Sequence, residues 1–252
     1  MTYHILNGDA LIDRFLATGL DGEMVVAREC LIEGDLEGDT LPQFWQTRAK
    51  YLGGVYNEQQ QRYFDDVASQ FEKLLAAPDP SEFNLWFGHD LFCQANMWFT
   101  LSLLDSLSIK KDVFVVYPSF LEPEHVWKEF GGATTNDLIT AYRNRTRFHE
   151  EDLKLGTELW TAYKNHDFGY LKNLSTTSSP CFPYLKEVCQ AHIDRFPVPG
   201  MKGRPERVIE EILQHSSKEF HVVFSEFSKR EGIYGFGDSQ LKDIYNRVLR
   251  HR

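Results

Sequence analysis

Three short apolar runs of this chain each end in polar residues that could do chemistry. After the first, second and third runs come, respectively, Asn7-Gly8-Asp9, Arg28-Glu29 and Gly88-His89-Asp90. An imidazole can shuttle protons near neutral pH, and a neighbouring carboxylate sets its pKa. A guanidinium can hold a carboxylate or a phosphate through two parallel hydrogen bonds. These residue types therefore indicate acid–base chemistry on an anionic ligand.

Roles for the individual residues follow from their chemistry. We predict that His89 is the proton shuttle, in a catalytic set with Asp90, Asp9 and Glu29. Glycine in such turns lets the backbone approach a ligand closely, and Gln94 lies one helical turn past Asp90. The residues expected to bind the ligand are Asn7, Gly8, Arg28, Gln94 and, further along the chain, Arg48.

The acidic residues of this set allow other interpretations. Asp9, Asp90 and Glu29 could together ligate Mg²⁺ or another divalent cation, because hard cations prefer oxygen ligands. Asp9 and Asp90 each stand just ahead of a predicted helix, where a carboxylate can cap the first turn. One aspartate cannot readily be both a helix cap and a metal ligand, so these interpretations compete. Capping accounts for neither the Arg28-Glu29 pair nor the histidine beside Asp90.

The elements that must position these residues alternate between strand and helix. Apolar runs predict four strands, and helical periodicity predicts the segments between them. The strands are expected at Tyr3–Leu6, Glu23–Ala27, Phe83–Phe87 and Val113–Tyr117, and the helices at Ala10–Leu20, Leu41–Ala77 (in two pieces separated by Gly53-Gly54) and Leu91–Leu107. This alternation predicts an α/β fold with a Rossmann-like or flavodoxin-like, mainly parallel sheet and helices on both faces. The carboxyl ends of such strands meet at one edge, where ligands bind.

The last hundred residues show a different pattern, with helical periodicity and no convincing strand. Helices are predicted at Glu151–His166, Tyr184–Phe196, Pro205–Gln214, Phe220–Lys229 and Ser239–Arg250, with a polar loop at Leu171–Pro183. The three short helices at the end suggest a helix-turn-helix-like unit. We therefore predict an α/β domain over residues 1–148 and a smaller all-helical domain over residues 149–252.

Composition and charge narrow the class of protein. The chain has 252 residues, 42% of them hydrophobic, which is enough for a buried core and excludes a disordered chain. Its net charge of -10 argues against nonspecific nucleic-acid binding, which depends on Lys and Arg. From Met201 onward, however, 10 Lys and Arg face 8 Asp and Glu, so a nucleic-acid contact stays open for residues 200–252.

Segments that would direct the chain to a membrane or out of the cell are not found in the sequence. No apolar run approaches the length of a membrane span, and the N-terminus lacks the pattern of a signal peptide. We therefore expect a cytoplasmic protein without a membrane partner, whose oligomeric state the sequence leaves open.

Neither the four cysteines nor the common ligand-binding motifs identify a reaction or a cofactor. Cys30, Cys93, Cys181 and Cys189 are too widely spaced for a redox or zinc CxxC motif. Cys30 and Cys93 lie beside the polar residues above, but we interpret them as small buried hydrophobes rather than reactive thiols. The chain also lacks the phosphate-loop, dinucleotide-binding and nucleophile-elbow motifs.

Several spaced motifs resemble two bacterial families. His4–Asp9, Arg28-Glu29 with Glu33-Gly34, and Trp86–Gln94 resemble domain-of-unknown-function family 1835. Phe182-Pro183 with Leu185, Arg195–Pro197, Glu206-Arg207 and Gly235–Asp238 resemble family 3658, which commonly follows it. The resemblance implies a bacterial cytoplasmic protein, and it implies no particular reaction.

Two functions are compatible with these features, beside a third possibility, a purely structural interaction module. The first is that the protein binds, or acts on, a small anionic or phosphorylated ligand at the strand ends. The alternative is a regulatory or adaptor protein whose helical C-terminal domain contacts nucleic acid or a protein partner. Whether the protein is an enzyme, and on which substrate, is left open by the sequence.

Overall fold

The computed structural model describes residues 1–56 and 59–250. Residues 57–58 belong to the predicted helical stretch Leu41–Ala77, and residues 251–252 to the predicted helical domain. Both pairs lie outside the described residues.

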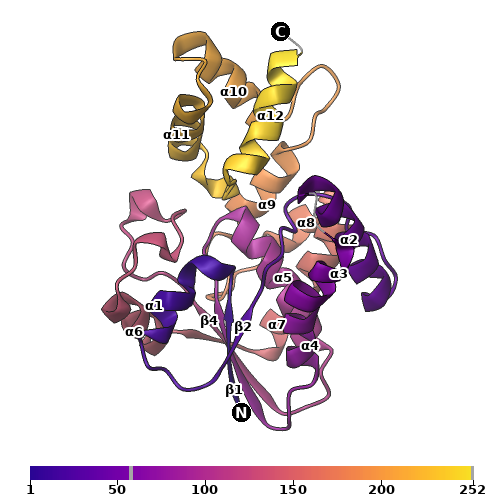
Figure 1. Ribbon diagram of the computed structural model, residues 1–252, viewed down its shortest axis with the longest axis vertical. Helices are drawn as coiled ribbons and strands as arrows, with labels where there is room; N and C mark the ends of the chain where they lie inside the picture. Colours follow the sequence, from indigo (N-terminus) through magenta and orange to yellow (C-terminus); the bar gives the residue numbers. More distant parts are fainter. Residues whose placement is uncertain (57–58, 251–252) are drawn as a thin grey trace.

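The centre of the fold is a five-stranded sheet in the order β2-β1-β3-β4-β5 (Figure 1). The strands are β1 (Thr2–Leu6), β2 (Glu23–Val26), β3 (Ser81–Trp86), β4 (Lys111–Val116) and β5 (Thr146–Phe148). The first four strands are parallel, as predicted, and β5 runs antiparallel to β4. The prediction of four strands is one strand short, because it omits β5. Strand β5 has only three residues, of which Phe148 alone is buried, and so short a segment shows no strand periodicity.

Helices cover both faces of the sheet, as expected. The bounds are α1 (Ile12–Leu16), α2 (Leu41–Tyr56), α3 (Gln60–Tyr63), α4 (Ser69–Leu75), α5 (Leu91–Asp105), α6 (Thr135–Arg143) and α7 (Glu150–Lys164). Alternate strand residues point to opposite faces. Leu6 and Trp86 belong to a core cluster with Phe15 of α1, whereas Ile5 and Leu85 belong to a second cluster that α2, α4, α5 and α7 share.

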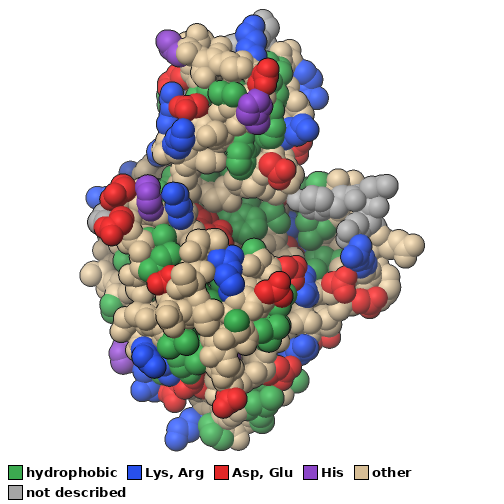
Figure 2. All heavy atoms as spheres, turned by 60° about the vertical axis from the view of Figure 1, so that its left-hand side comes forward, with side chains coloured by type: hydrophobic (Ala, Val, Ile, Leu, Met, Phe, Trp, Pro, Cys, Tyr) green, Lys and Arg blue, Asp and Glu red, His purple; other side chains and the backbone are tan. Residues whose placement is uncertain are grey.

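The remaining helices follow α7 in the chain. They are α8 (Phe168–Leu174), α9 (Leu185–Asp194), α10 (Arg204–His215), α11 (Phe220–Arg230) and α12 (Asp238–Arg250). Helices α10, α11 and α12 pack on one another and form an upper group above the sheet-containing part (Figure 1), and α9 packs on α5. One core cluster extends from Tyr3 to Val248. Figure 2 shows a hollow between this upper group of helices and the sheet-containing part, with hydrophobic side chains in its floor.

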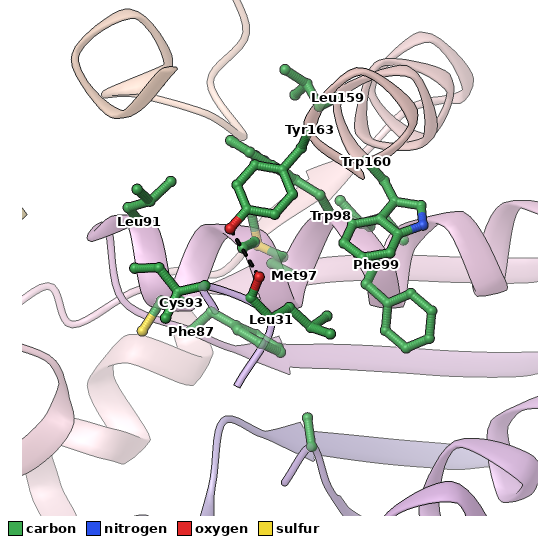
Figure 3. Packing of buried hydrophobic residues seen from close by; sticks show 14 of the residues in the cluster. Leu31, Phe87, Leu91, Cys93, Met97, Trp98, Phe99, Leu159, Trp160 and Tyr163 are labelled. Carbon is green, nitrogen blue, oxygen red and sulfur yellow. Dashed lines mark hydrogen bonds between the residues drawn. The ribbon is translucent and has the colours of Figure 1, made fainter. Parts of the chain in front are cut away.

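Helix α5 forms the middle layer between the sheet and α7 (Figure 3). Its Trp98 and Phe99 rings contact Tyr163 and Trp160 of α7, with centroids 5.8 and 5.1 Å apart. The Tyr163 hydroxyl donates a hydrogen bond of 2.9 Å to the carbonyl of Leu31. A helix that is apolar on most sides is expected to be buried in this way, and α5 carries the functional residues described below.

Two predictions about the helices are wrong. Helix α2 continues through Gly53-Gly54 to Tyr56, because each glycine costs a helix only about 1 kcal/mol relative to alanine and Phe44 and Trp45 anchor the same helix in the core. Helix α8 occupies part of the predicted loop Leu171–Pro183. Its buried leucines at 171 and 174 lie one turn apart, and Asp167 caps its first turn.

Within residues 1–56 and 59–250, none of the helices is both long enough and apolar enough to cross a bilayer.

Candidate functional site

The predicted ligand-binding edge coincides with the switch point of the sheet. In the order 2-1-3-4-5, the chain moves from β1 to a neighbour on one side and from β3 to a neighbour on the other. Ligands of open α/β sheets bind in the crevice outside the carboxyl ends of two such strands. Asn7 directly follows β1, its backbone N–H donates to the carbonyl of Trp86 at 3.3 Å, and Gly88 comes soon after β3.

Two carboxyl groups and a thiol gather at this point. The potential ligand atoms of Asp90, Cys93 and Glu129 all lie within 4.8 Å of one another, and we call them the acidic cluster. Asp90 and Cys93 are fully buried, and Glu129 is half-buried. A Cβ atom on Gly88 would come within 2.9 Å of the Asp90 Oδ2 and Glu129 Cγ atoms and 3.0 Å of the Cys93 Sγ atom. Glycine at position 88 therefore leaves room for the cluster.

The two carboxylate oxygens of Asp90 have different surroundings. Oδ1 accepts a hydrogen bond of 3.0 Å from the backbone N–H of Cys93, so Asp90 is the N-cap of α5. Oδ2 is buried and has no hydrogen-bond partner within the described residues. Capping uses only one oxygen, so the expected competition between capping and ligand binding does not arise at Asp90.

Burial shifts the pKa of every group in the acidic cluster. It raises the pKa of Asp90 to about 6 and, together with the charge of Asp90, the pKa of Glu129 to about 8. Burial and the two carboxylates hold the pKa of Cys93 well above its ordinary value, so in the metal-free cluster this residue is a thiol and not an activated nucleophile. Two carboxyl groups with different pKa values near neutrality can act as acid and base.

Asn7 connects the cluster to the neighbouring loops. Its Nδ2 group donates to the Cys93 Sγ atom at 3.1 Å, and its Oδ1 atom accepts from Asn96 Nδ2 at 2.9 Å. Asn96 also donates to the carbonyl of Glu29 at 2.8 Å. The Asn7 side chain is therefore fixed at the cluster, as its predicted site role requires. Asn96 was not predicted, although an amide within an otherwise apolar helix is a signal of such a role.

The histidine of the predicted site lies among aromatic rings. The His89 ring stacks on Tyr117, with centroids 4.1 Å apart, and meets the edge of Tyr184 at 5.0 Å. Burial lowers the pKa of His89 to about 4, so the ring is neutral at pH 7. In the part of the chain that the structure describes, no hydrogen bond joins the ring to Asp90 or Glu29. The structure therefore does not bring the predicted shuttle together with its predicted carboxylate partners.

Gln94 supports the turn that precedes the cluster. Its Nε2 group donates to the carbonyl of Gly88 at 2.8 Å and to the Tyr117 hydroxyl at 3.2 Å. Tyr117 in turn donates to the carbonyl of Cys181 at 2.9 Å. Gln94 thus faces the predicted edge, where it positions the backbone of Gly88.

Asp9 and Arg28 form an ion pair of 2.8 Å at the rim of a separate cleft. Asp9 does not cap the following turn, because Gly8 occupies the N-cap position with a φ of 83° and the Asp9 carboxylate binds Arg28 instead. The capping prediction for Asp9 is therefore wrong. This cleft has a volume of about 580 Å³ and is also lined by Arg62 and Asp66.

Glu29 and Arg48 form a second ion pair, which is completely buried. Arg48 Nη2 lies 2.9 Å from Glu29 Oε2, and the Tyr63 hydroxyl donates to Glu29 Oε1 at 2.5 Å. Arg48 also donates to the carbonyls of Cys30 and Glu33. These contacts fasten the loop after β2 to helix α2 and occupy both charged groups.

Two clefts open beside Glu129. The first, which we call the Trp86 pocket, has a volume of about 460 Å³ and is lined by Asn7, Leu11, Arg14, Trp86, Glu129 and Phe130 among others. The second has about 880 Å³ and lies between residues 124–129 and helix α11, with Trp127, Phe227 and Phe236 in its walls. Glu129 was not predicted as a site residue, because residues 118–134 show no helix or strand periodicity that would place them near the strand ends.

The raised pKa values lead to a prediction about stability and pH. The native pKa values of Glu129 and Asp90 exceed the unfolded values of about 4.3 and 3.9. The native state therefore binds more protons between about pH 4 and pH 8, and the free energy of unfolding is expected to fall as pH rises through this window. Glu129→Gln is expected to weaken that fall by about 4 kcal/mol between pH 5 and pH 8.5.

Urea unfolding at the two pH values measures this difference. Glu124→Gln is the matched control, because Glu124 is an exposed residue of the same segment. An unchanged pH dependence in Glu129→Gln would show that Glu129 is not held protonated in the native state.

Comparison of the chain with protein-family models, curated proteins and solved structures finds no match. The site is therefore interpreted from its own geometry, and the resemblance to families 1835 and 3658 stays a prediction.

Proposed function

We propose that this protein binds a small molecule with an apolar body and an anionic group in the Trp86 pocket, and that the metal-free Asp90–Glu129 pair exchanges a proton with it. The observation that carries the proposal is the position of Glu129. This residue lines the pocket and also belongs to the buried acidic cluster at the switch point.

The walls of the Trp86 pocket support a ligand of this kind. Leu11, Trp86 and Phe130 provide apolar surface for a ring or a short hydrocarbon, and about 460 Å³ is within the usual range for small ligands. Arg14 stands at the edge of the pocket, where its Nη1 group donates to the carbonyls of Phe130 and Gly131 at 3.0 and 2.6 Å. Together with Lys128 it makes the rim attractive to an anion.

The anionic ligand expected from the sequence is thus retained, with different cations. Arg28 and Arg48 are engaged by Asp9 and Glu29, respectively. Arg14 and Lys128 therefore bind the anionic group of the ligand in their place. Near neutral pH the pair Asp90 and Glu129 can release or take up a proton, since burial raises the pKa values of both carboxyl groups.

A binding screen tests this proposal. We expect at least one of benzoate, phenyl phosphate, hexanoate and their close analogues to raise the melting temperature at millimolar concentration in the presence of a chelator. Arg14→Gln should abolish this stabilisation. Arg62→Gln, which changes an arginine of the separate cleft beside Asp9 and Arg28, should leave it intact. Failure of every compound, or equal loss in both variants, would contradict the proposal.

We also propose that the predicted helical domain, residues 149–252, closes the site from above. Gly235 and Phe236 line the larger cleft beside Glu129, and Gly235 lies against Asp90. The alternative, in which a helix-turn-helix-like end contacts nucleic acid, has less support. Lys202, Arg204 and Arg247 form ion pairs with neighbouring glutamates, which leaves fewer cations for phosphates.

A further inference from the structure

We propose that the acidic cluster, Asp90, Cys93 and Glu129, is a metal site for a borderline divalent cation such as Zn²⁺. The inference goes beyond the proposed function, which concerns the Trp86 pocket and the metal-free state of Asp90 and Glu129. It rests on the geometry of the three side chains and on the surroundings of two of them.

The distances within the cluster suit a small ion after a modest contraction. Zinc binds thiolate sulfur at about 2.3 Å and carboxylate oxygen at about 2.0–2.2 Å, so tetrahedral ligand atoms lie about 3.3–3.8 Å apart. The three ligand atoms here lie within 4.8 Å of one another. A movement of about 1 Å, within the reach of side-chain rotation at the half-buried Glu129, closes this difference.

The second, independent observation is the Oδ2 atom of Asp90. Asp90 is fully buried, yet this oxygen has no hydrogen-bond partner among the described residues. A buried carboxylate oxygen without a partner costs free energy. The atom lies 2.9 Å from the position that a Cβ atom on Gly88 would take, a position that Glu129 Cγ and Cys93 Sγ also border. A cation would satisfy it while Oδ1 continues to cap helix α5.

Cys93 determines which class of metal fits. Thiolate ligands favour zinc and disfavour magnesium, which prefers oxygen. Asn7 Nδ2 donates to the Cys93 sulfur at 3.1 Å, and Asn96 fixes the orientation of Asn7. Hydrogen bonds of this kind around a metal ligand stabilise its charge and hold its geometry.

This assignment differs from the hard-cation set expected from the sequence. Of Asp9, Asp90 and Glu29, only Asp90 belongs to the cluster, because Asp9 and Glu29 bind Arg28 and Arg48. A site with three protein ligands leaves a fourth position for water or a ligand, as in catalytic zinc sites. Glu129 lines the Trp86 pocket, so the metal site would lie beside that pocket.

Cobalt provides a direct test, because Co²⁺ takes the same ligands as zinc and reports sulfur coordination in its spectrum. The purified full chain, reduced and free of metal, is titrated with Co²⁺ in the absence of any organic ligand. We expect one equivalent to bind with a thiolate-to-cobalt charge-transfer band and intense visible bands of tetrahedral type. Zn²⁺ should abolish these bands, and Mg²⁺ should not.

Variants identify the ligands. Cys93→Ser should remove the charge-transfer band and weaken Zn²⁺ binding at least tenfold, whereas Cys30→Ser, at a thiol outside the cluster, should change neither. Circular dichroism shows whether each variant is folded. If Cys93→Ser does not fold, Glu129→Gln serves instead and should also weaken Zn²⁺ binding at least tenfold.

The proposal is overturned if the wild-type protein shows no cobalt bands, or if Cys30→Ser removes them and Cys93→Ser does not. An unchanged Zn²⁺ affinity in Glu129→Gln would overturn it as well. Since metal binding is measured without pocket ligand, and pocket-ligand binding is measured with chelator, the two proposals fail separately.

Discussion

Replacing Arg48 with methionine is expected to lower the free energy of unfolding by about 3 to 5 kcal/mol. Arg48 and Glu29 are both completely buried, and removal of the guanidinium leaves a carboxylate without a counter-charge in the interior. Arg48 also donates to the carbonyls of Cys30, Glu33 and Asp35. The variant therefore loses the contacts that hold the loop after β2 against helix α2.

The Arg28–Asp9 pair provides a matched control. Arg28 follows strand β2, as Glu29 does, and it also binds a carboxylate. Both side chains of the pair are substantially exposed, 32% and 59%, so Arg28→Met is expected to change the stability by no more than about 1 kcal/mol. Urea denaturation at pH 7 measures both variants. Similar losses in the two would mean that burial does not govern the strength of these pairs.

The contrast between these two ion pairs shows what could be predicted from the sequence. The strand ends were located within two residues, and Asp9, Arg28, Glu29 and Asp90 do follow them. Periodicity reports which segments are buried, but it does not report which charged groups meet. The partner of Glu29 is on a helix 19 residues further along the chain, and that pairing depends on how α2 packs against the loop after β2.

The acidic cluster escaped prediction for two further physical reasons. Glu129 lies in a segment between β4 and α6 that has only short 3-10 turns, so no repeating pattern placed it near β3. Cys93 was interpreted as a small buried hydrophobe, and it is indeed buried. Burial alone, however, did not reveal that its neighbours are two carboxylates and an amide, because they come from three different loops.

The other large effect is expected for Gly235→Ala, which should lower the free energy of unfolding by about 2 to 4 kcal/mol. Gly235 has a φ of 62°, which is unfavourable for any residue with a Cβ atom. The added Cβ would also overlap the Asp90 Oδ1 atom, the acceptor that caps α5. Asp90 is fully buried and has little room to withdraw, so the cap would be lost together with the local packing.

Gly200→Ala separates the two contributions, because Gly200 also has a positive φ, 82°, but no atom within 4 Å of the added Cβ. It should cost about 1 to 2 kcal/mol, which is the conformational strain alone. Denaturant unfolding gives the stabilities, and amide hydrogen exchange at Cys93 reports the cap. If Gly235→Ala costs no more than Gly200→Ala and the Cys93 amide stays protected, the loop before α12 does not hold Asp90 in place. Greater loss with faster exchange would mean that this loop, far along the chain, keeps the carboxylate of the acidic cluster in position.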